Sequence, residues 1–162
     1  MGKSLKWPVG LGGKGNEGVT GLIKQAPGAV GYIELAYANQ NHLPVAALKN
    51  REGQFVVPSL ASVTAAAAGV SVPEDYRVSI TDAPGPDSYP IAAFTYLLVY
   101  RDVADPLRGA ALARFLWWAA HDGQRLAPAL DYAPLPAALV TRVEATVRSL
   151  TAQGKPALGN GR

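Results

Sequence analysis

The chain has 162 residues, 49% of them hydrophobic, and a formal net charge of +3. This composition excludes a disordered chain and allows one domain with a sizeable core. Because there is no cysteine, disulfides, thiol catalysis and Cys-ligated zinc are excluded. The basic residues are scattered, which argues against a nucleic-acid partner, and no apolar run is long enough for a membrane span.

The first third of the chain predicts a strand, a glycine-rich loop, a helix and a second strand, a βαβ-like unit. A short apolar run at Trp7 leads into a loop with glycines at 10, 12, 13 and 15. Asn16 is expected to cap the helix that follows, and Pro27-Gly28 ends that helix. The second strand is expected over Ala29–Leu35. The apolar face of the helix carries Val19, Leu22, Ile23 and Ala26.

The loop before this helix is a candidate anion site. Unpaired N–H groups and the positive end of the helix dipole point at such a loop. The candidate contacts are Gly13, Lys14, Gly15 and Asn16.

The middle of the chain predicts a β-hairpin and then a helix. Val45–Leu48 and Phe55–Val57 are the two arms of the hairpin. A helix over Leu60–Ala68 begins after Ser59 and ends at Gly69. Residues 70–88 contain Pro73, Pro84 and Pro86 and are expected to be irregular, apart from one short strand near residues 78–80.

Ile91–Tyr100 is the strongest strand signal in the chain, because it is almost continuously apolar, as in a strand buried on both faces. Asp105-Pro106 then begins a helix that runs to about Asp122. The expected buried stripe of this helix is Leu107, Ala111, Phe115 and Trp118.

The C-terminal part predicts a short helical piece near residues 124–130 and a last helix from Ala137 to about Thr151. The tail from Gln153 is expected to fray. The buried stripe of the last helix is Val140, Val143, Val147 and Leu150, with Arg142, Glu144 and Arg148 facing water.

A dinucleotide-dependent enzyme is one alternative. Gly10-x-Gly12-x-x-Gly15, with Glu34 downstream, matches the dinucleotide fingerprint. No further βαβ unit follows Glu34, however, and glycines that shape a tight turn are the simpler interpretation. A phosphate P-loop is excluded, because Lys14 is followed by Gly15 instead of Ser or Thr.

The two histidines, His42 and His121, have no metal-ligand partner at characteristic spacing. They are expected to be ordinary surface or helix C-terminal residues. No catalytic residue and no metal site is predicted, and no cofactor is expected.

Two stretches resemble one family: Trp7-Pro8-x-Gly10-x-Gly12-Gly13-Lys14-Gly15-Asn16-x-Gly18 and Pro27-Gly28-Ala29-x-Gly31-Tyr32-x-Glu34-x-Ala36-Tyr37-Ala38. They are similar to the periplasmic phosphate-binding proteins of phosphate ABC transporters. Three later motifs agree, namely Tyr89-Pro90-Ile91, Phe115-x-Trp117-Trp118-Ala119 and Leu130-Asp131-Tyr132-Ala133-x-Leu135-Pro136. The resemblance covers nearly all of this chain but only about the C-terminal half of the family.

The resemblance implies an α/β fold of the type II periplasmic-binding-protein class, present as the C-terminal half of a two-lobe clamshell. Residues 1–88 would belong to the second lobe. Residues 89–162 would supply a hinge strand and the C-terminal helices that complete the first lobe.

The function implied is phosphate binding as the substrate-binding component of an ABC transporter, and not catalysis. Inorganic phosphate and a membrane permease are the implied partners of the complete protein. The implied location is the periplasm or the extracellular face of the membrane, although Met1–Lys6 has no apolar signal region.

The chain departs from the family in one respect that bears on the site. The family's phosphate contacts lie mostly in its first half, which ends in a Ser-Gly-Thr motif that this sequence lacks. No ligand residue is therefore carried over, and the loop from Gly13 to Asn16 is expected to make weak anion contacts only. The chain is expected to pair with the missing N-terminal half or with itself, and a self-associating interaction module is a second alternative.

Overall fold

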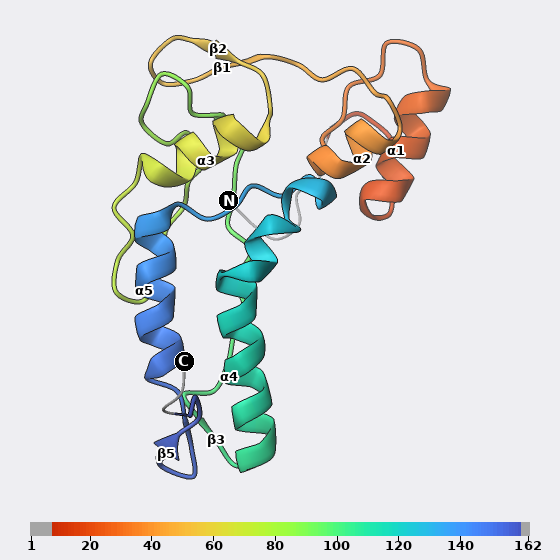
Figure 1. Cartoon of the computed structure of the whole chain (residues 1–162). Helices are drawn as coiled ribbons and strands as arrows, with labels where there is room; N and C mark the ends of the chain where they lie inside the picture. The colour runs from red at the N-terminus through yellow and green to blue at the C-terminus, as the bar shows by residue number, and fades with distance from the viewer. Residues whose placement is uncertain (1–7, 160–162) are drawn as a thin grey trace. The chain divides into compact units, whose positions relative to one another are not determined.

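The computed structural model in Figure 1 describes residues 8–159. The chain divides into two compact units, one up to Val45 and one from Ala46 onward. Helices and short sheets occur together, as expected for a partial α/β fold. Two parts of the sequence analysis concern residues outside the described range, namely the apolar run at Trp7 and the lack of a signal region in Met1–Lys6. No helix between residues 8 and 159 has the length and apolar character needed to cross a bilayer.

The first unit consists of two helices and irregular backbone. Helix α1 spans Gly15–Gln25 and contacts α2, which spans Leu35–Gln40. The prediction of a strand over residues 29–35 is wrong: residues 29–34 are irregular and Leu35 already begins α2. Val30 is 98% exposed there. A strand is stable only beside a hydrogen-bonded neighbour, and the described part of this unit contains no strand.

The second unit begins with the predicted hairpin. Strand β1 (Leu48–Lys49) pairs antiparallel with β2 (Phe55–Val56). Asn50 organises the turn, because its side-chain oxygen accepts the Gln54 N–H at 3.0 Å while its amide donates to the Pro86 carbonyl at 2.8 Å. One buried side chain therefore joins the hairpin to the proline-rich loop.

Helix α3 (Leu60–Ala68) has the predicted ends. The hydroxyl of Ser59 accepts the Ser62 N–H at 3.1 Å, the Ser62 hydroxyl accepts the Ser59 N–H at 2.9 Å, and Gly69 follows. This reciprocal capping box is encoded within four residues. Residues 70–88 are irregular as predicted, but the short strand near residues 78–80 does not form. Ile80 is instead a buried anchor beside Ala66 and Ala92.

The strand predicted over Ile91–Tyr100 is also wrong. Its residues form no strand, and Leu98 and Tyr100 are 95% and 86% exposed. From this part of the chain only the following β3 (Asp102–Val103) enters a sheet, where it pairs parallel with β4 (Thr151–Ala152). A strand buried on both faces needs neighbours along its whole length, and the described part of this chain provides one only at the end.

Helix α4 (Pro106–Ala120) starts where predicted, because the Asp105 carboxylate accepts the N–H groups of Leu107 and Arg108 at 2.9 and 3.2 Å. The predicted buried stripe is wrong, however. Leu107, Phe115 and Trp118 are 84%, 54% and 44% exposed, and Ala111 is exposed as well.

The small residues of α4 are buried instead, namely Gly109, Ala113 and Ala120. At Gly109 an added Cβ would lie 2.7 Å from the Ala152 Cβ. Small side chains allow β4 to approach closely here, whereas the large apolar stripe has nothing in the described chain to pack against.

Helix α5 (Ala137–Arg148) lies beside α4, after two 3₁₀ turns, η1 (Asp122–Arg125) and η2 (Pro128–Leu130) (Figure 1). These turns agree with the short helical piece predicted near residues 124–130. Trp117 packs against the core between the two helices, which also contains Ala113, Val147, Leu150, Ala152 and Leu158.

Residues 153–159 of the C-terminal tail complete a hairpin and pack on the core, so the prediction of fraying is wrong for them. Strand β5 (Lys155–Pro156) pairs antiparallel with β4. Gln153 and Gly154 between them have φ values of 51° and 73°, which is the type I′ geometry of a tight hairpin. Leu158 after the hairpin is buried in the core.

Candidate functional site

The predicted anion loop stands at the start of α1. Lys14 is the residue before the helix, with φ −81° and ψ 115°, and its carbonyl accepts the Gly18 N–H at 3.1 Å. Gly15 begins the helix with a φ of +66°, a value that favours glycine. The prediction that Asn16 caps the helix is therefore wrong, because α1 starts two residues earlier than such a cap requires and the capping position belongs to Lys14, whose side chain has no acceptor.

Asn16 has a different partner. Its side-chain oxygen accepts the backbone N–H of Glu34 at 3.0 Å. From the first turn of α1 the amide reaches the residue that directly precedes α2. Asn16 thus fastens the two helices of the first unit, and its acceptor is used within the fold.

Glu17 brings a negative charge to the same turn. The Tyr37 hydroxyl donates to its carboxylate at 2.7 Å. This bond first, and the backbone N–H of Glu17 second, lower the pKa of the carboxyl. An ionised Glu17 is favourable beside the positive end of the α1 dipole, but it repels any further anion. Sequence analysis overlooked Glu17, although an acid in the first turn is a readable signal.

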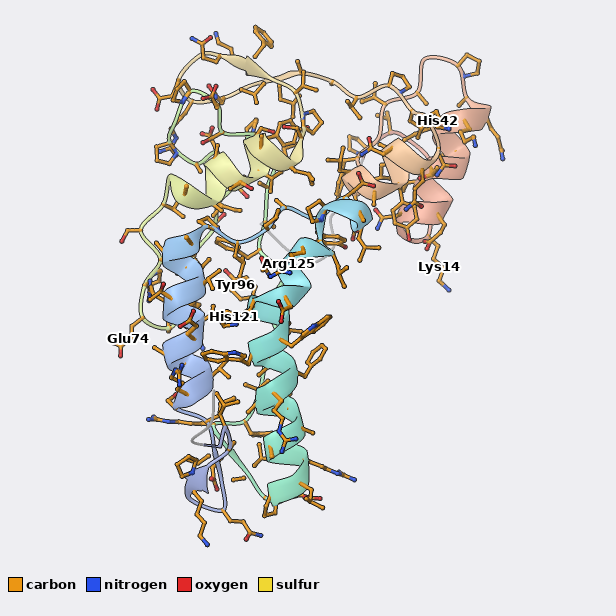
Figure 2. All side chains as sticks on the ribbon, viewed as in Figure 1. Lys14, His42, Glu74, Tyr96, His121 and Arg125 are labelled. Carbon is orange, nitrogen blue, oxygen red and sulfur yellow. The ribbon has the colours of Figure 1, made fainter. Side chains whose placement is uncertain are left out.

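Packing requires a glycine at Gly13, whereas an added Cβ at Gly12 would meet nothing within 4 Å. An added Cβ at Gly13 would lie 2.6 Å from the backbone nitrogen of Val19. The loop therefore lies directly against the second turn of α1. Lys14 is exposed, and Figure 2 shows its side chain extending away from the loop. The loop thus combines one exposed lysine with the Glu17 carboxylate at the positive end of the α1 dipole.

The dinucleotide alternative requires a strand on each side of the glycine loop. No strand is present between residues 8 and 34, and the backbone of Glu34 is occupied by Asn16. The glycine pattern is thus not set in the strand–loop–helix–strand unit that presents a dinucleotide to a helix N-terminus.

The histidines lie in different units. His42 follows α2, is exposed and has a φ of 54°. His121 ends α4, as expected for a helix C-terminal residue. Between residues 8 and 159, no group of three or more His, Asp or Glu side chains is placed to hold a metal ion.

His121 has contacts that sequence analysis overlooked. Its ring stacks on Trp117, and its Nε2 lies 2.9 Å from the Glu144 carboxylate. The spacing of four residues to Trp117 could have been noticed in the sequence. The partner on α5 could not, because it depends on the packing of α4 against α5.

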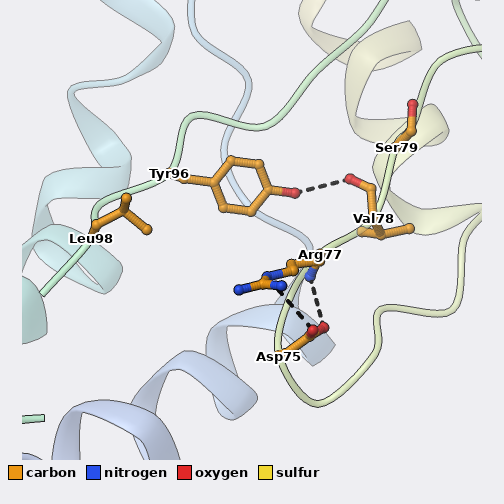
Figure 3. Close-up of a pocket in the computed structure, with 6 residues that line it drawn as sticks. All are labelled: Asp75, Arg77, Val78, Ser79, Tyr96 and Leu98. Atoms are coloured by element: carbon orange, nitrogen blue, oxygen red, sulfur yellow. Dashed lines mark hydrogen bonds and ion pairs between the residues drawn. The ribbon is translucent and has the colours of Figure 1, made fainter.

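A shallow groove of about 640 Å³ lies in the second unit (Figure 3). Its tyrosine, Tyr96, donates to the Val78 carbonyl at 2.9 Å, and its charged groups, Arg77 and Asp75, pair with each other at 3.8 Å. These three polar side chains thus interact with the protein itself. The groove is mainly apolar and offers no convergent set of donors for an oxyanion from the six residues that line it.

Comparison with known proteins gives the family. Residues 3–122 match the model of the PBP superfamily domain. The phosphate-binding protein PstS of Xylella fastidiosa (strain 9a5c) is 42% identical over 146 residues, which is 89% of this chain and 40% of the relative. PstS of Pasteurella multocida is 40% identical over 90% of this chain and 43% of its own length. PstS of Methanocaldococcus jannaschii is 41% identical over 83% of this chain and 39% of its own length.

These relatives are named for phosphate binding, which points to a binding protein. This chain spans about 40% of their length. The resemblance seen in the glycine-rich and Tyr89-Pro90 motifs is confirmed over most of the sequence. The chain belongs to the PBP superfamily.

Proposed function

We propose that this chain is part of a phosphate-binding protein that serves an ABC transporter, and that it does not act as an enzyme. The observation that carries the proposal is about 40% identity, over most of the chain, to three proteins named for phosphate binding. The transporter's membrane permease is the partner proposed for the complete receptor. Its proposed place of action is the periplasm or the extracellular face of the membrane.

We also propose that the phosphate site is completed by polypeptide that corresponds to the rest of these relatives. Phosphate is strongly hydrated, so tight binding needs many convergent donors that replace water. The loop from Gly13 to Asn16 offers a few N–H groups and Lys14 in an exposed setting, next to the Glu17 carboxylate. In water such contacts contribute little.

The exposed apolar surface of the second unit supports this proposal. It consists of Ile91, the run Tyr96–Tyr100 and the α4 stripe of Leu107, Phe115 and Trp118. Large exposed apolar surfaces mark places where other protein packs. Since about 60% of the length of each relative has no counterpart in this chain, the complementing part of the receptor is the proposed occupant.

In the complete receptor we assign residues 1–88 to the second lobe and residues 89–162 to the first. Tyr89-Pro90 suits a lobe crossing because proline keeps the preceding residue extended. On complementation, protection from hydrogen exchange is expected to change its pattern near residue 88. A single block of protection that continues across this position would contradict the assignment.

The test of binding is calorimetric titration with phosphate at near-physiological salt. The chain is measured alone and together with the part of the Xylella PstS that it does not match. We expect no tight binding by the chain alone, and restored binding in the complemented sample. Micromolar or tighter binding by the chain alone would place the site within these residues and contradict the complementation proposal.

Self-association is a second candidate function, favoured by the same exposed segment, in which Leu97 and Leu98 are 63% and 95% exposed. The segment Ile91–Tyr100 contains no charged residue, so two copies could pair without repulsion. Light scattering over a range of concentrations decides between the candidates. A dimer that persists when the complementing polypeptide is added favours self-association. A dimer that dissociates when this polypeptide is added favours the proposal that the chain is part of a receptor.

A further inference from the structure

His121 is held between two hydrogen-bond acceptors at the end of α4. Its Nδ1 lies 2.6 Å from the Trp117 carbonyl and its Nε2 lies 2.9 Å from the Glu144 carboxylate on α5. An acceptor requires a proton on the ring nitrogen that faces it. A neutral imidazole carries one such proton and an imidazolium carries two, so only the charged ring satisfies both contacts.

The charges around the ring come from two elements besides α4. Helix α5 contributes Glu144 and also Arg148, whose guanidinium lies 4.4 Å from the centre of the Trp117 ring. The 3₁₀ turn η1 contributes Asp122, which pairs with Arg125 at 3.2 Å. The negative end of the α4 dipole also falls at His121 and favours a positive charge there.

The ring also contributes to packing. It stacks on the Trp117 indole with centroids 4.4 Å apart and an interplanar angle of 26°, and Figure 2 shows it in the space between α4 and α5. Trp117 packs against the core that the two helices share. His121 therefore lies directly against a residue of the core that joins the two helices.

We propose that His121 is a proton-controlled clasp that joins the end of α4 to α5. The imidazolium holds the Trp117 carbonyl and the Glu144 carboxylate together. When the ring loses a proton, one of the two nitrogens faces an acceptor without a hydrogen, and that bond is lost. The clasp is independent of phosphate binding and of the proposed function.

The direction of the pH dependence follows from the ring's partners. The hydrogen bond to the Trp117 carbonyl first, and the bond to Glu144 second, raise the pKa of His121. A raised pKa in the folded state means that the clasp is closed below the pKa of an unfolded histidine. The clasp opens as the pH rises through the higher, folded value.

The first test is a pH titration of His121 that is monitored by NMR. His42→Asn removes the other histidine, and asparagine tolerates the left-handed backbone at that position. We expect His121 in the folded chain to titrate at a higher pH than the same residue in urea. Glu144→Gln, which keeps the size of the side chain, is expected to lower the midpoint. The matched control, Glu74→Gln on the loop before Asp75, is expected to leave it in place.

The second test asks whether titration moves the helices. The chain has no cysteine, so spin labels can be placed at Arg114→Cys on α4 and Ala145→Cys on α5, both at exposed positions. We expect the distance distribution between the labels to broaden as His121 loses its proton, and to stay unchanged with pH in Glu144→Gln, because the glutamine amide can accept from the charged ring and donate to the neutral one. An unshifted His121 midpoint would overturn the proposal, and so would a label distance that does not change with pH while Glu144 is present.

Discussion

The hydroxyl of Tyr76 donates to the backbone carbonyl of Arg142 at 2.9 Å, across 66 residues of sequence. The contact is reciprocal, because the Arg142 guanidinium lies 5.2 Å from the centre of the Tyr76 ring and donates to the carbonyls of Val72 and Pro73. The irregular segment after α3 is thus fastened to α5 by one arginine and one tyrosine.

This latch predicts that Arg142→Lys is not a conservative change. Lysine keeps the charge but lacks the planar fork with which arginine donates to two carbonyls and stacks on a ring. We expect a loss of roughly 1–2 kcal/mol in the free energy of unfolding, measured in urea. Arg114→Lys, at an exposed position on α4, is the matched control. An equal effect of the two changes would show that the latch contributes nothing.

Two glycines of the first unit are predicted to respond in opposite directions to alanine. At Gly13 an added Cβ would lie 2.6 Å from the Val19 backbone nitrogen, whereas at Gly21 it would meet nothing within 4 Å. Gly21→Ala is therefore expected to stabilise α1 by about 0.5–1 kcal/mol. Gly13→Ala is expected to destabilise it through the clash with backbone. Hydrogen exchange in α1 measures both, and a Gly13→Ala variant with unchanged exchange would contradict the close packing of the loop.

The Tyr37–Glu17 hydrogen bond predicts a dependence of the first unit on pH. The lowered pKa of Glu17 means that its contribution is present above the pKa of the unfolded carboxyl and disappears as the pH falls through the folded value. Tyr37→Phe is expected to weaken protection of α1 at neutral pH and to match the unmodified chain in strong acid. Tyr32→Phe, at a position 83% exposed, is the control. If Tyr37→Phe also weakens protection in strong acid, the effect comes from lost packing and not from the hydrogen bond to Glu17.

Leu98 offers a test of the exposed apolar segment. Because its side chain is 95% exposed, Leu98→Asp is expected to change the free energy of unfolding of the isolated chain by less than about 0.5 kcal/mol. In the complementation assay it is expected to weaken association strongly, since burying a charge without a partner is costly. Ser71→Asp, at another exposed position of the second unit, is the control. If the two variants associate equally well, Leu98 does not lie in the contact surface.

The sequence by itself determined the features that depend on a few neighbouring residues. Ser59 and Ser62 specify the start of α3, and Asp105-Pro106 specifies the start of α4, because caps act within one turn. The family was readable for a similar reason, since motifs such as the Gly10–Gly18 stretch need no partner to be recognised. The β-turn at Gln153-Gly154 was overlooked, although glycine after a polar residue is a local signal for a hairpin.

The tertiary structure decided what depends on distant partners. Ile91–Tyr100 has the composition of a buried strand, but a strand forms only where neighbours accept its hydrogen bonds, and here pairing is confined to Asp102–Val103. Helix α4 buries Gly109 and Ala113, and leaves Phe115 exposed, because β4 and α5 approach its small residues. Asn16 and His121 likewise obtained their partners, Glu34 and Glu144, from packing, since no local pattern encodes which residue a long-range contact will bring within hydrogen-bonding distance.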